Sequence, residues 1–223
     1  MKFGDVELIW KGNASFLIKA RGKIIYIDPY QLHSVSEEEK ADIILITHGH
    51  QDHCSIEDLG KVAKSGTLVL TPADCQSKMT KLDELQMRVV EPGDEIDLGK
   101  IRVKAVHAYN INKQFHDKSE NWMGYIVEIG NLVIYHAGDT DLIPEMEKLT
   151  GYSKQGNEFI ALLPIGGIYT MDVEEAVEAA SKIKPSLVIP MHYGSLAGSE
   201  EDARKFCELA KERGLKCMIL EKE

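Results

Sequence analysis

The first part of the chain contains short segments rich in apolar residues, separated by turn-forming residues. Such segments cover residues 6–10, 15–20 and 23–28. Short segments of this kind are typical of strands, and the glycine-containing breaks between them favour hairpins. Residues 43–46 are all apolar, which is typical of a strand buried on both faces. We therefore predict a meander of hairpins and a buried strand at 42–47, in a sheet that helices must cover.

Helical and strand patterns alternate along the rest of the chain. Asp172 and Ser199 stand where an N-cap would begin an amphipathic helix. We predict helices at 56–64, 72–82, 172–183 and 199–213, and strands at 67–71, 88–90, 101–106, 123–129, 132–135, 159–163, 187–190 and 216–220. No fixed-period repeat and no long linker rich in proline, glycine or serine divides the chain. We expect one α/β domain spanning residues 1–223.

Charge and length narrow the range of partners. The 223 residues include 26 Lys and Arg against 36 Asp and Glu, which gives a formal net charge of -10. An acidic chain repels a phosphate backbone, so we expect no nucleic-acid partner. No segment approaches the roughly 20 apolar residues of a membrane span, and the N-terminus lacks the apolar pattern of a signal peptide. We expect a soluble, cytoplasmic protein without a membrane partner.

The four cysteines do not predict a disulfide framework. They are Cys54, Cys75, Cys207 and Cys217, without CxxC spacing, and they are few for a chain of this size. We expect reduced thiols. Cys54 directly follows a cluster of histidines, and we interpret it as a packing residue.

That cluster is the strongest chemical signal in the sequence. His48, His50, Asp52 and His53 lie within six residues, directly after the buried strand predicted at 42–47. Imidazole nitrogens and carboxylate oxygens are ligands that divalent zinc, manganese or iron accept, and the absence of cysteine argues against a structural zinc knot. The alternative is a surface cluster without metal. The density of potential ligands favours a metal site.

Three further polar residues each follow an apolar strand. His107 follows the predicted strand 101–106, Asp139 comes shortly after the predicted strand 132–135, and His192 comes shortly after the predicted strand 187–190. Considered alone, each would more often be a hydrogen-bonded core or loop residue than a ligand. The carboxyl ends of strands are nevertheless where side chains converge on a shared site.

Together these residues resemble the metallo-β-lactamase-fold superfamily. Its His-x-His-x-Asp-His motif matches residues 48–53 without a gap, and His107, Asp139 and His192 match the remaining ligand positions in order. Asp28 matches a position where that family supports a ligand. The resemblance implies a four-layer αβ/βα sandwich, with two mixed sheets face to face and helices outside. The segments 163–171 and 190–194 resemble small metal-dependent hydrolases related to ascorbate-6-phosphate lactonase and, more distantly, N-acyl phosphatidylethanolamine phospholipases D.

The resemblance also implies a binuclear centre. It assigns His48, His50 and His107 to one metal ion and Asp52, His53 and His192 to the other, with Asp139 as the bridge. Zinc is the expected metal, with manganese or iron as alternatives. A metal-bridging hydroxide would then cleave a small ester, lactone, thioester or phosphodiester, and Asp52 and Asp139 would be the catalytic carboxylates.

The segment after His107 is where we expect the substrate to be recognised. We interpret Asn110, His116 and Tyr193 as candidate substrate contacts, with a small molecule, including an anionic one, as the partner. His33 and His136 receive no role from the resemblance, although His136 could instead support a ligand by hydrogen bonding. Assembly into a homo-oligomer stays open.

Other functions fit the same metal ligands. One is an RNA-processing nuclease of the same fold, which the net charge disfavours. Another is a di-iron redox protein, although 223 residues leave no room for an added flavin domain. A non-catalytic metal-binding scaffold is the third alternative.

Overall fold

The computed structural model describes residues 1–82, 85–154 and 156–223, which form two compact units. Unit 1 comprises Met1–Glu91 and Leu220–Glu223, and unit 2 comprises Pro92–Ile219. Each unit is built on one mixed sheet with helices, so the α/β class and the two mixed sheets expected from the sequence are confirmed. The assignment of residues 1–223 to one domain stays a prediction.

Unit 1 contains a seven-stranded sheet whose spatial order follows the sequence. The strands are β1 (Lys2–Phe3), β2 (Val6–Gly12), β3 (Ser15–Ala20), β4 (Lys23–Ile27), β5 (Ile43–Leu45), β6 (Leu68–Thr71) and β7 (Gln86–Val89). Strands β1 to β4 are antiparallel, and β4 to β7 are parallel. The predicted meander is therefore confirmed, and it continues into a parallel half whose strands end at a common edge.

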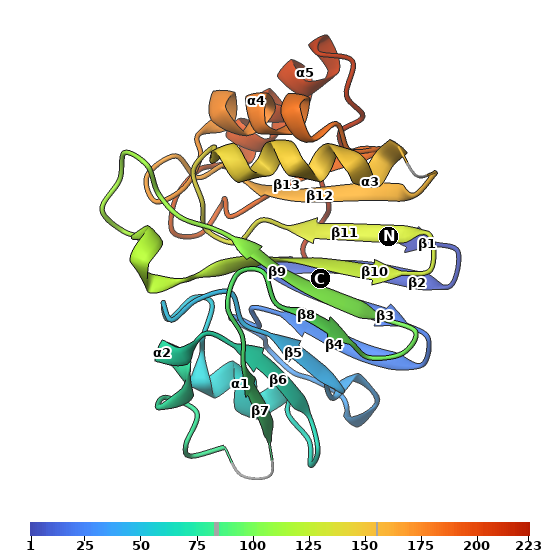
Figure 1. Cartoon of the computed structure of the whole chain (residues 1–223), viewed down its shortest axis with the longest axis vertical. Helices are drawn as coiled ribbons and strands as arrows, with labels where there is room; N and C mark the ends of the chain where they lie inside the picture. Colours follow the sequence, from blue (N-terminus) through green and yellow to red (C-terminus); the bar gives the residue numbers. More distant parts are fainter. Residues whose placement is uncertain (83–84, 155) are drawn as a thin grey trace. The chain divides into compact units, whose positions relative to one another are not determined.

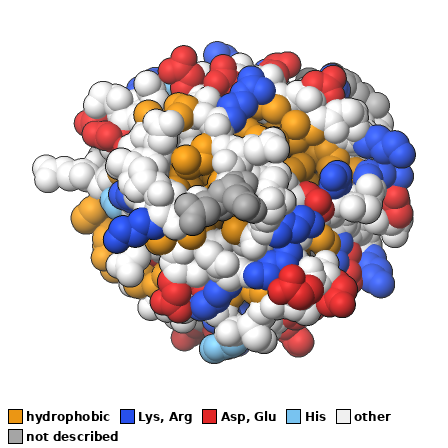
Figure 2. Space-filling view, turned by 90° about the horizontal axis from the view of Figure 1, so that it is seen from below, with side chains coloured by type: hydrophobic (Ala, Val, Ile, Leu, Met, Phe, Trp, Pro, Cys, Tyr) orange, Lys and Arg blue, Asp and Glu red, His pale blue; other side chains and the backbone are white. Residues whose placement is uncertain are grey.

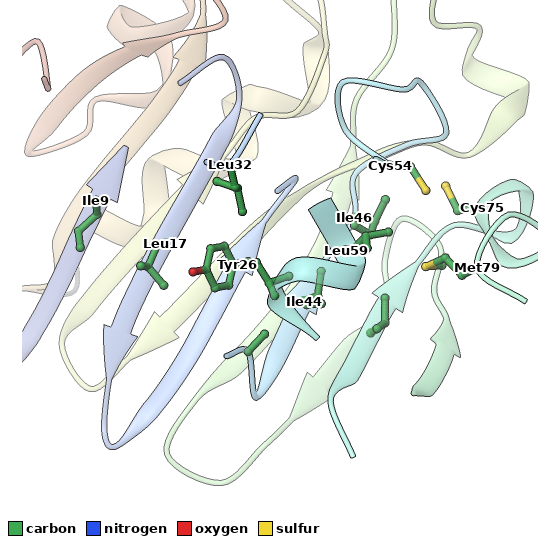
Figure 3. Packing of buried hydrophobic residues seen from close by; sticks show 13 residues of the cluster. Ile9, Leu17, Tyr26, Leu32, Ile44, Ile46, Cys54, Leu59, Cys75 and Met79 are labelled. Carbon is green, nitrogen blue, oxygen red and sulfur yellow. The ribbon is translucent and has the colours of Figure 1, made fainter. Parts of the chain in front are cut away.

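Helices α1 (Ile56–Val62) and α2 (Ala73–Gln76) accompany the parallel half of this sheet, and a short 3-10 helix, η1, spans Glu37–Glu39. The predicted helix at 72–82 is thus shorter than expected, because its later part consists of turns. Figure 3 shows the core beneath these helices, where Tyr26, Ile44, Leu59 and Met79 pack together. All four side chains are buried, so burial of this cluster holds the helices to the sheet.

Unit 2 contains a six-stranded sheet in the order β13-β12-β11-β10-β9-β8. The strands are β8 (Glu95–Asp97), β9 (Arg102–His107), β10 (Met123–Ile129), β11 (Leu132–His136), β12 (Glu158–Pro164) and β13 (Leu187–Met191). Strands β8 to β11 are antiparallel, and β11 to β13 are parallel. Strands β9, β11, β12 and β13 consequently run in one direction, so their carboxyl ends lie at one edge of the sheet.

The helices of unit 2 lie along β12 and β13, as Figure 1 shows. They are α3 (Gly151–Lys154), α4 (Val173–Ile183) and α5 (Glu200–Glu212), with 3-10 helices η2 (Lys118–Glu120) and η3 (Pro144–Thr150). Asp172 forms a full capping box with Glu175, and Ser199 forms one with Asp202. The N-caps predicted from the sequence are therefore confirmed.

The C-terminal part of the chain differs from two of the predictions. Residues 216–220 do not form the predicted strand; Cys217 makes only an isolated parallel bridge to Val188. Cys207 and Cys217 are joined in a disulfide, so the prediction of four reduced thiols was wrong for this pair. After α5 the chain turns at Gly214, which has a φ of 74°, and this brings the two Cα atoms within 5.2 Å. Cys54 and Cys75 are free and buried.

Within the described residues, no helix is long and apolar enough to cross a membrane. The face shown in Figure 2 carries lysine and arginine side chains interspersed with aspartate and glutamate. The described residues on this face form no continuous basic surface of the kind that tracks a nucleic-acid backbone.

Candidate metal centre

Asp28 and Thr47 organise the histidine cluster of unit 1 at the ends of two neighbouring strands. Asp28 directly follows β4, and Thr47 lies just beyond β5. The Asp28 carboxylate accepts hydrogen bonds from the Thr47 backbone N–H at 2.8 Å and from its hydroxyl at 2.6 Å. Oδ2 of Asp28 also lies 2.7 Å from Nδ1 of His53. A buried carboxylate on one ring nitrogen orients the imidazole and leaves Nε2 to act as a ligand.

The second ring nitrogen of His53 faces a further potential ligand. Nε2 of His53 lies 3.1 Å from Oδ2 of Asp52, and the same carboxylate oxygen accepts a hydrogen bond from Nδ2 of Asn13 at 2.9 Å. Asn13 adopts a left-handed conformation in the β2–β3 turn, with a φ of 49°. This turn residue therefore also holds Asp52 in position.

His48 and His50 form a second pair of closely spaced nitrogens. Nε2 of His48 lies 3.0 Å from Nδ1 of His50, and Nδ1 of His48 lies 3.0 Å from Oγ1 of Thr47. Gly49 lies between them, and a Cβ there would lie 2.1 Å from Oδ2 of Asp74, so a larger residue would require the Asp74 side chain to move. Lys78 also donates a hydrogen bond to the Gly49 carbonyl.

The donor set of unit 1 therefore fits a divalent metal. Donor atoms bound to one zinc ion at about 2.0–2.2 Å lie roughly 3.4 Å apart in tetrahedral geometry. The nitrogen–oxygen distance of 3.1 Å and the nitrogen–nitrogen distance of 3.0 Å in this cluster are close to that spacing. Two imidazole rings are also fixed by contacts with Asp28 and Thr47, as ligand rings in metalloproteins usually are.

Asp139 lies at the carboxyl edge of the unit 2 sheet, three residues after β11. Only 4% of its surface is exposed. The preceding Gly138 has a φ of 67°, and a Cβ there would lie 2.7 Å from the carbonyl oxygen of Met123. Glycine is therefore required for the chain to pass β10 closely and to direct Asp139 along the edge.

Two buried imidazoles lie beside the Asp139 carboxylate. Nε2 of His192, the residue directly after β13, lies 3.1 Å from Oδ2 of Asp139. Nε2 of His116, from the loop between β9 and β10, lies 3.4 Å from the same oxygen. His192 has a φ of 58°, a left-handed conformation that turns the chain at the strand end. Unit 2 thus brings a carboxylate and two imidazoles to within donor spacing.

His107 ends β9 at the same sheet edge, as the sequence predicted, but it is only partly buried. Its ring lies edge-on to that of Tyr109, with the centroids 6.2 Å apart. Within the described residues, its Nδ1 has no hydrogen-bond partner. Its assignment as a metal ligand stays a prediction.

Asp141 fixes the loop that follows His107. Its carboxylate accepts hydrogen bonds from the backbone N–H groups of Ile111 at 2.8 Å and Asn112 at 3.3 Å. Lys113 makes an ion pair with Oδ1 of Asp141 at 2.5 Å. Only 3% of Asp141 is exposed, so this carboxylate is a buried anchor whose oxygens are satisfied by several donors.

Asn110 and Tyr193, both interpreted as substrate contacts, are buried. Nδ2 of Asn110 donates to the carbonyl oxygen of Tyr169 at 2.9 Å and to Oδ1 of Asp141 at 3.2 Å. Burial, with a smaller contribution from the charge of Glu200, raises the pKa of Tyr193 to about 12. The Tyr193 hydroxyl therefore stays protonated at neutral pH, and Asn110 has a structural role in the loop.

A second network ties the same loop to η3. The Tyr109 hydroxyl donates to Glu145 at 2.9 Å, and Lys118 pairs with Glu145 at 2.9 Å while its Nζ lies 4.4 Å from the centre of the Tyr109 ring. Burial alone would raise the pKa of Glu145. This effect of burial is outweighed by hydrogen bonds to Glu145 from Lys118, from the Glu145 backbone and from Tyr109, and by the charge of Lys118. The pKa of Glu145 is therefore lowered to about 2.

Sequence reasoning missed Asp141. Asp141 is two residues after Asp139 in Gly-Asp-Thr-Asp, and only this proximity to a predicted ligand could have indicated it. His116, a candidate substrate contact, is buried, with only 1% of it exposed. His136 is fully buried, and its Nδ1 accepts a hydrogen bond from the Gly138 backbone at 3.2 Å; His33 is exposed.

Comparison with known proteins shows which family shares these residues and this fold. The family model described as a beta-lactamase superfamily domain matches residues 7–192, which include both clusters. The chain belongs to the beta-lactamase superfamily. Within that superfamily it is 37% identical over 224 residues to a UPF0173 metal-dependent hydrolase of Thermoplasma acidophilum, an alignment that covers 98% of this chain and 97% of the relative.

Two solved structures share the fold over nearly the whole chain. A crystal structure from Parabacteroides distasonis has a TM-score of 0.83 and 29% identity, covering 98% of this chain and 94% of that one. Igni18, a metallo hydrolase from Ignicoccus hospitalis, has a TM-score of 0.76 and 25% identity, covering 97% and 95%. The narrower resemblance to lactonases or phospholipases D stays a prediction.

Proposed function

We propose that the predicted histidine and aspartate ligands bind two divalent metal ions, and that the protein hydrolyses a small ester, lactone, thioester or phosphodiester. Membership of the beta-lactamase superfamily and a relative described as a metal-dependent hydrolase support this proposal. The donor atoms within each unit also have the spacing that metal ligands need.

The observation that carries the proposal is the environment of His53. Its Nδ1 lies against the buried Asp28 carboxylate at 2.7 Å, while its Nε2 faces Oδ2 of Asp52 at 3.1 Å. A carboxylate that fixes one imidazole nitrogen, with a second carboxylate beside the other, is the arrangement of a histidine prepared to bind metal. A histidine that served only in packing would not need two acidic neighbours.

The proposed ligands are the predicted ones. They are His48, His50, His107, Asp52, His53, Asp139 and His192. When bound, two divalent cations lower the pKa of water to about 7 and so supply hydroxide at neutral pH. Zinc is the metal we propose, because imidazole nitrogen and carboxylate oxygen are among its usual ligands.

The residues of the chain would then orient the reaction. Asp139, whose carboxylate offers two oxygens, would help to hold the ions, and Asn13 keeps Asp52 aligned through its 2.9 Å hydrogen bond. The loop of residues 108–122, anchored by Asp141, would bound the substrate. No serine or cysteine nucleophile is required.

The test is a measurement of metal content followed by an activity screen. The purified protein should contain about two metal ions per chain and should hydrolyse at least one member of a panel of lactones, thioesters and phosphodiesters. Chelation should abolish that activity and zinc should restore it. An absence of bound metal would refute the proposal.

The same experiments separate the alternative functions. A structured RNA belongs in the panel, because RNA cleavage faster than ester hydrolysis would favour the nuclease alternative. Bound iron together with turnover of oxygen would favour the redox alternative.

A further inference from the structure

We propose that His116 supplies a ligand to the metal centre, in the place that the sequence pattern assigns to His107. This inference rests on the proposed function and changes one residue of its ligand set. It begins from the 3.4 Å distance between Nε2 of His116 and Oδ2 of Asp139.

The hydrogen bonds of Asn110 determine which nitrogen of His116 carries the proton. Nδ2 of Asn110 donates to the Tyr169 carbonyl and to Asp141, so its Oδ1 faces His116. That oxygen accepts from the His116 backbone N–H at 3.0 Å and lies 3.0 Å from Nδ1 of the same residue. Because Oδ1 can only accept, Nδ1 must carry a hydrogen. In the neutral imidazole Nε2 then holds a lone pair, which is the form that binds a metal.

Nε2 of His116 lies beside the Asp139 carboxylate of unit 2. Nε2 of His116 and Nε2 of His192 lie 3.4 Å and 3.1 Å from Oδ2 of Asp139. Both distances are close to the roughly 3.4 Å between donor atoms that share a zinc ion. His116 and His192 are therefore similarly placed beside Asp139. His192 occupies a ligand position in the family pattern.

His116 is also held as rigidly as a ligand ring needs to be. Only 1% of it is exposed, and its ring packs edge-on against Trp122 with the centroids 5.5 Å apart. Its backbone N–H and its Nδ1 both contact Asn110, which is itself fixed by Asp141. A hydrogen-bonded partner on the nitrogen that does not bind metal is the usual arrangement for a metal-binding imidazole.

His107 lacks these features. It is partly exposed, and in the part of the chain that the structure describes its Nδ1 has no hydrogen-bond partner. Its ring contact is with Tyr109, at 6.2 Å between centroids. No described contact joins His107 to Asp139, whereas His116 and His192 both have one.

Cysteine substitution combined with cobalt loading separates the two histidines. We would strip the metal from the wild type, His116→Cys, His107→Cys and His33→Cys, and load each protein with Co²⁺. A thiolate bound to Co²⁺ gives a charge-transfer absorption in the near ultraviolet, and the wild type, which retains free Cys54 and Cys75, provides the baseline. His33→Cys is the control for an added exposed thiol. Bound cobalt per chain and far-ultraviolet circular dichroism are recorded for every variant.

We expect the new band in His116→Cys alone. We also expect His116→Ala to bind zinc at least about tenfold more weakly than the wild type, with His107→Ala close to the wild type.

A band in His107→Cys, alone or together with His116→Cys, would overturn the assignment. Bound cobalt without a band in either variant would overturn it too, and would leave His116 as a hydrogen-bonding neighbour of Asp139. A folded wild type that takes up no metal would instead refute the proposed function itself. If His116→Cys does not fold, the two alanine variants decide by their zinc affinities.

Discussion

Nδ1 of His53 lies 2.7 Å from Oδ2 of Asp28, and both side chains are fully buried. The same carboxylate accepts two hydrogen bonds from Thr47. One acidic side chain thus joins the end of β4, the end of β5 and a predicted metal ligand, so that the position of the ligand depends on the packing of the sheet.

We predict that Asp28→Ala weakens metal binding about 10- to 100-fold, because His53 loses the group that orients its ring. The variant should also lose stability by roughly 1–3 kcal/mol, since the buried N–H of Thr47 loses its acceptor. Metal affinity by competition with a chelator and unfolding in urea measure the two effects. Asp5→Ala, which removes an exposed partner of Arg21, is the control and should change neither. Unchanged metal affinity in Asp28→Ala would contradict a supporting role.

Asp139→Ala should abolish turnover and release at least one metal ion per chain, because Asp139 is the carboxylate that the resemblance assigns to both ions. The fold should survive, since the adjacent Gly138 turn does not depend on the Asp139 side chain. Metal analysis, circular dichroism and assays on whichever substrate the panel identifies test this. Full activity in Asp139→Ala would exclude Asp139 as the bridge.

Asp141→Ala should loosen the loop of residues 108–122. Removing one partner of a buried ion pair costs roughly 3–5 kcal/mol, and here Lys113 and the backbone of Ile111 and Asn112 lose their acceptor together. Limited proteolysis should cut the loop faster, and KM should rise. Asp117→Ala is the matched control, because Asp117 only caps η2 at the surface of the same loop. Equal proteolysis rates in the two variants would show that Asp141 is not the anchor.

The hydrogen bonds and ion pair of Glu145 make the stability of the folded protein depend on pH. The pKa of Glu145 is lowered to about 2 in the folded protein, below the value of about 4.3 expected in an unfolded chain. Its contribution is therefore complete above about pH 5 and is lost as the pH falls toward 2. The stability difference between wild type and Glu145→Gln should shrink over that window. Glu147→Gln on the same helix is the control, and a difference that persists at pH 2 would argue against the ionised pair.

Reduction of the Cys207–Cys217 disulfide should destabilise unit 2. The crosslink closes a loop with a sequence separation of 10, for which chain entropy predicts roughly 3 kcal/mol. A reductant should lower the melting temperature of the wild type, and Cys207→Ser should show the lower value with and without reductant. A wild-type melting temperature that does not respond to reductant would show that the disulfide does not contribute.

Much of this structure could be predicted because it follows from local pattern. The capping boxes at Asp172 and Ser199 are encoded within four residues each. The all-apolar run at 43–46 indicated a strand buried on both faces, and in the structure β5 lies between two parallel neighbours. The position of Asp139 and His192 at strand ends followed from the same alternation of strands and helices.

The environment of His116 could not be predicted in this way. Its position depends on Asn110, six residues earlier, and on Asp141, which is far along the chain. Likewise, the pairing of Cys207 with Cys217 depends on where α5 ends and how the chain turns at Gly214. Contacts between loops have no periodicity, so the sequence pattern does not contain them.

The anchoring of the 108–122 loop on Asp141 leaves Ile111 and Phe115 exposed, by 52% and 44%. Substitutions at these two positions should cost little folding free energy, whereas changes at Asp141 or Asn110 remove buried hydrogen bonds. Natural selection can therefore vary the outer part of this loop while its base stays constant. The preference for a substrate can then change over evolutionary time without a loss of the metal-binding residues.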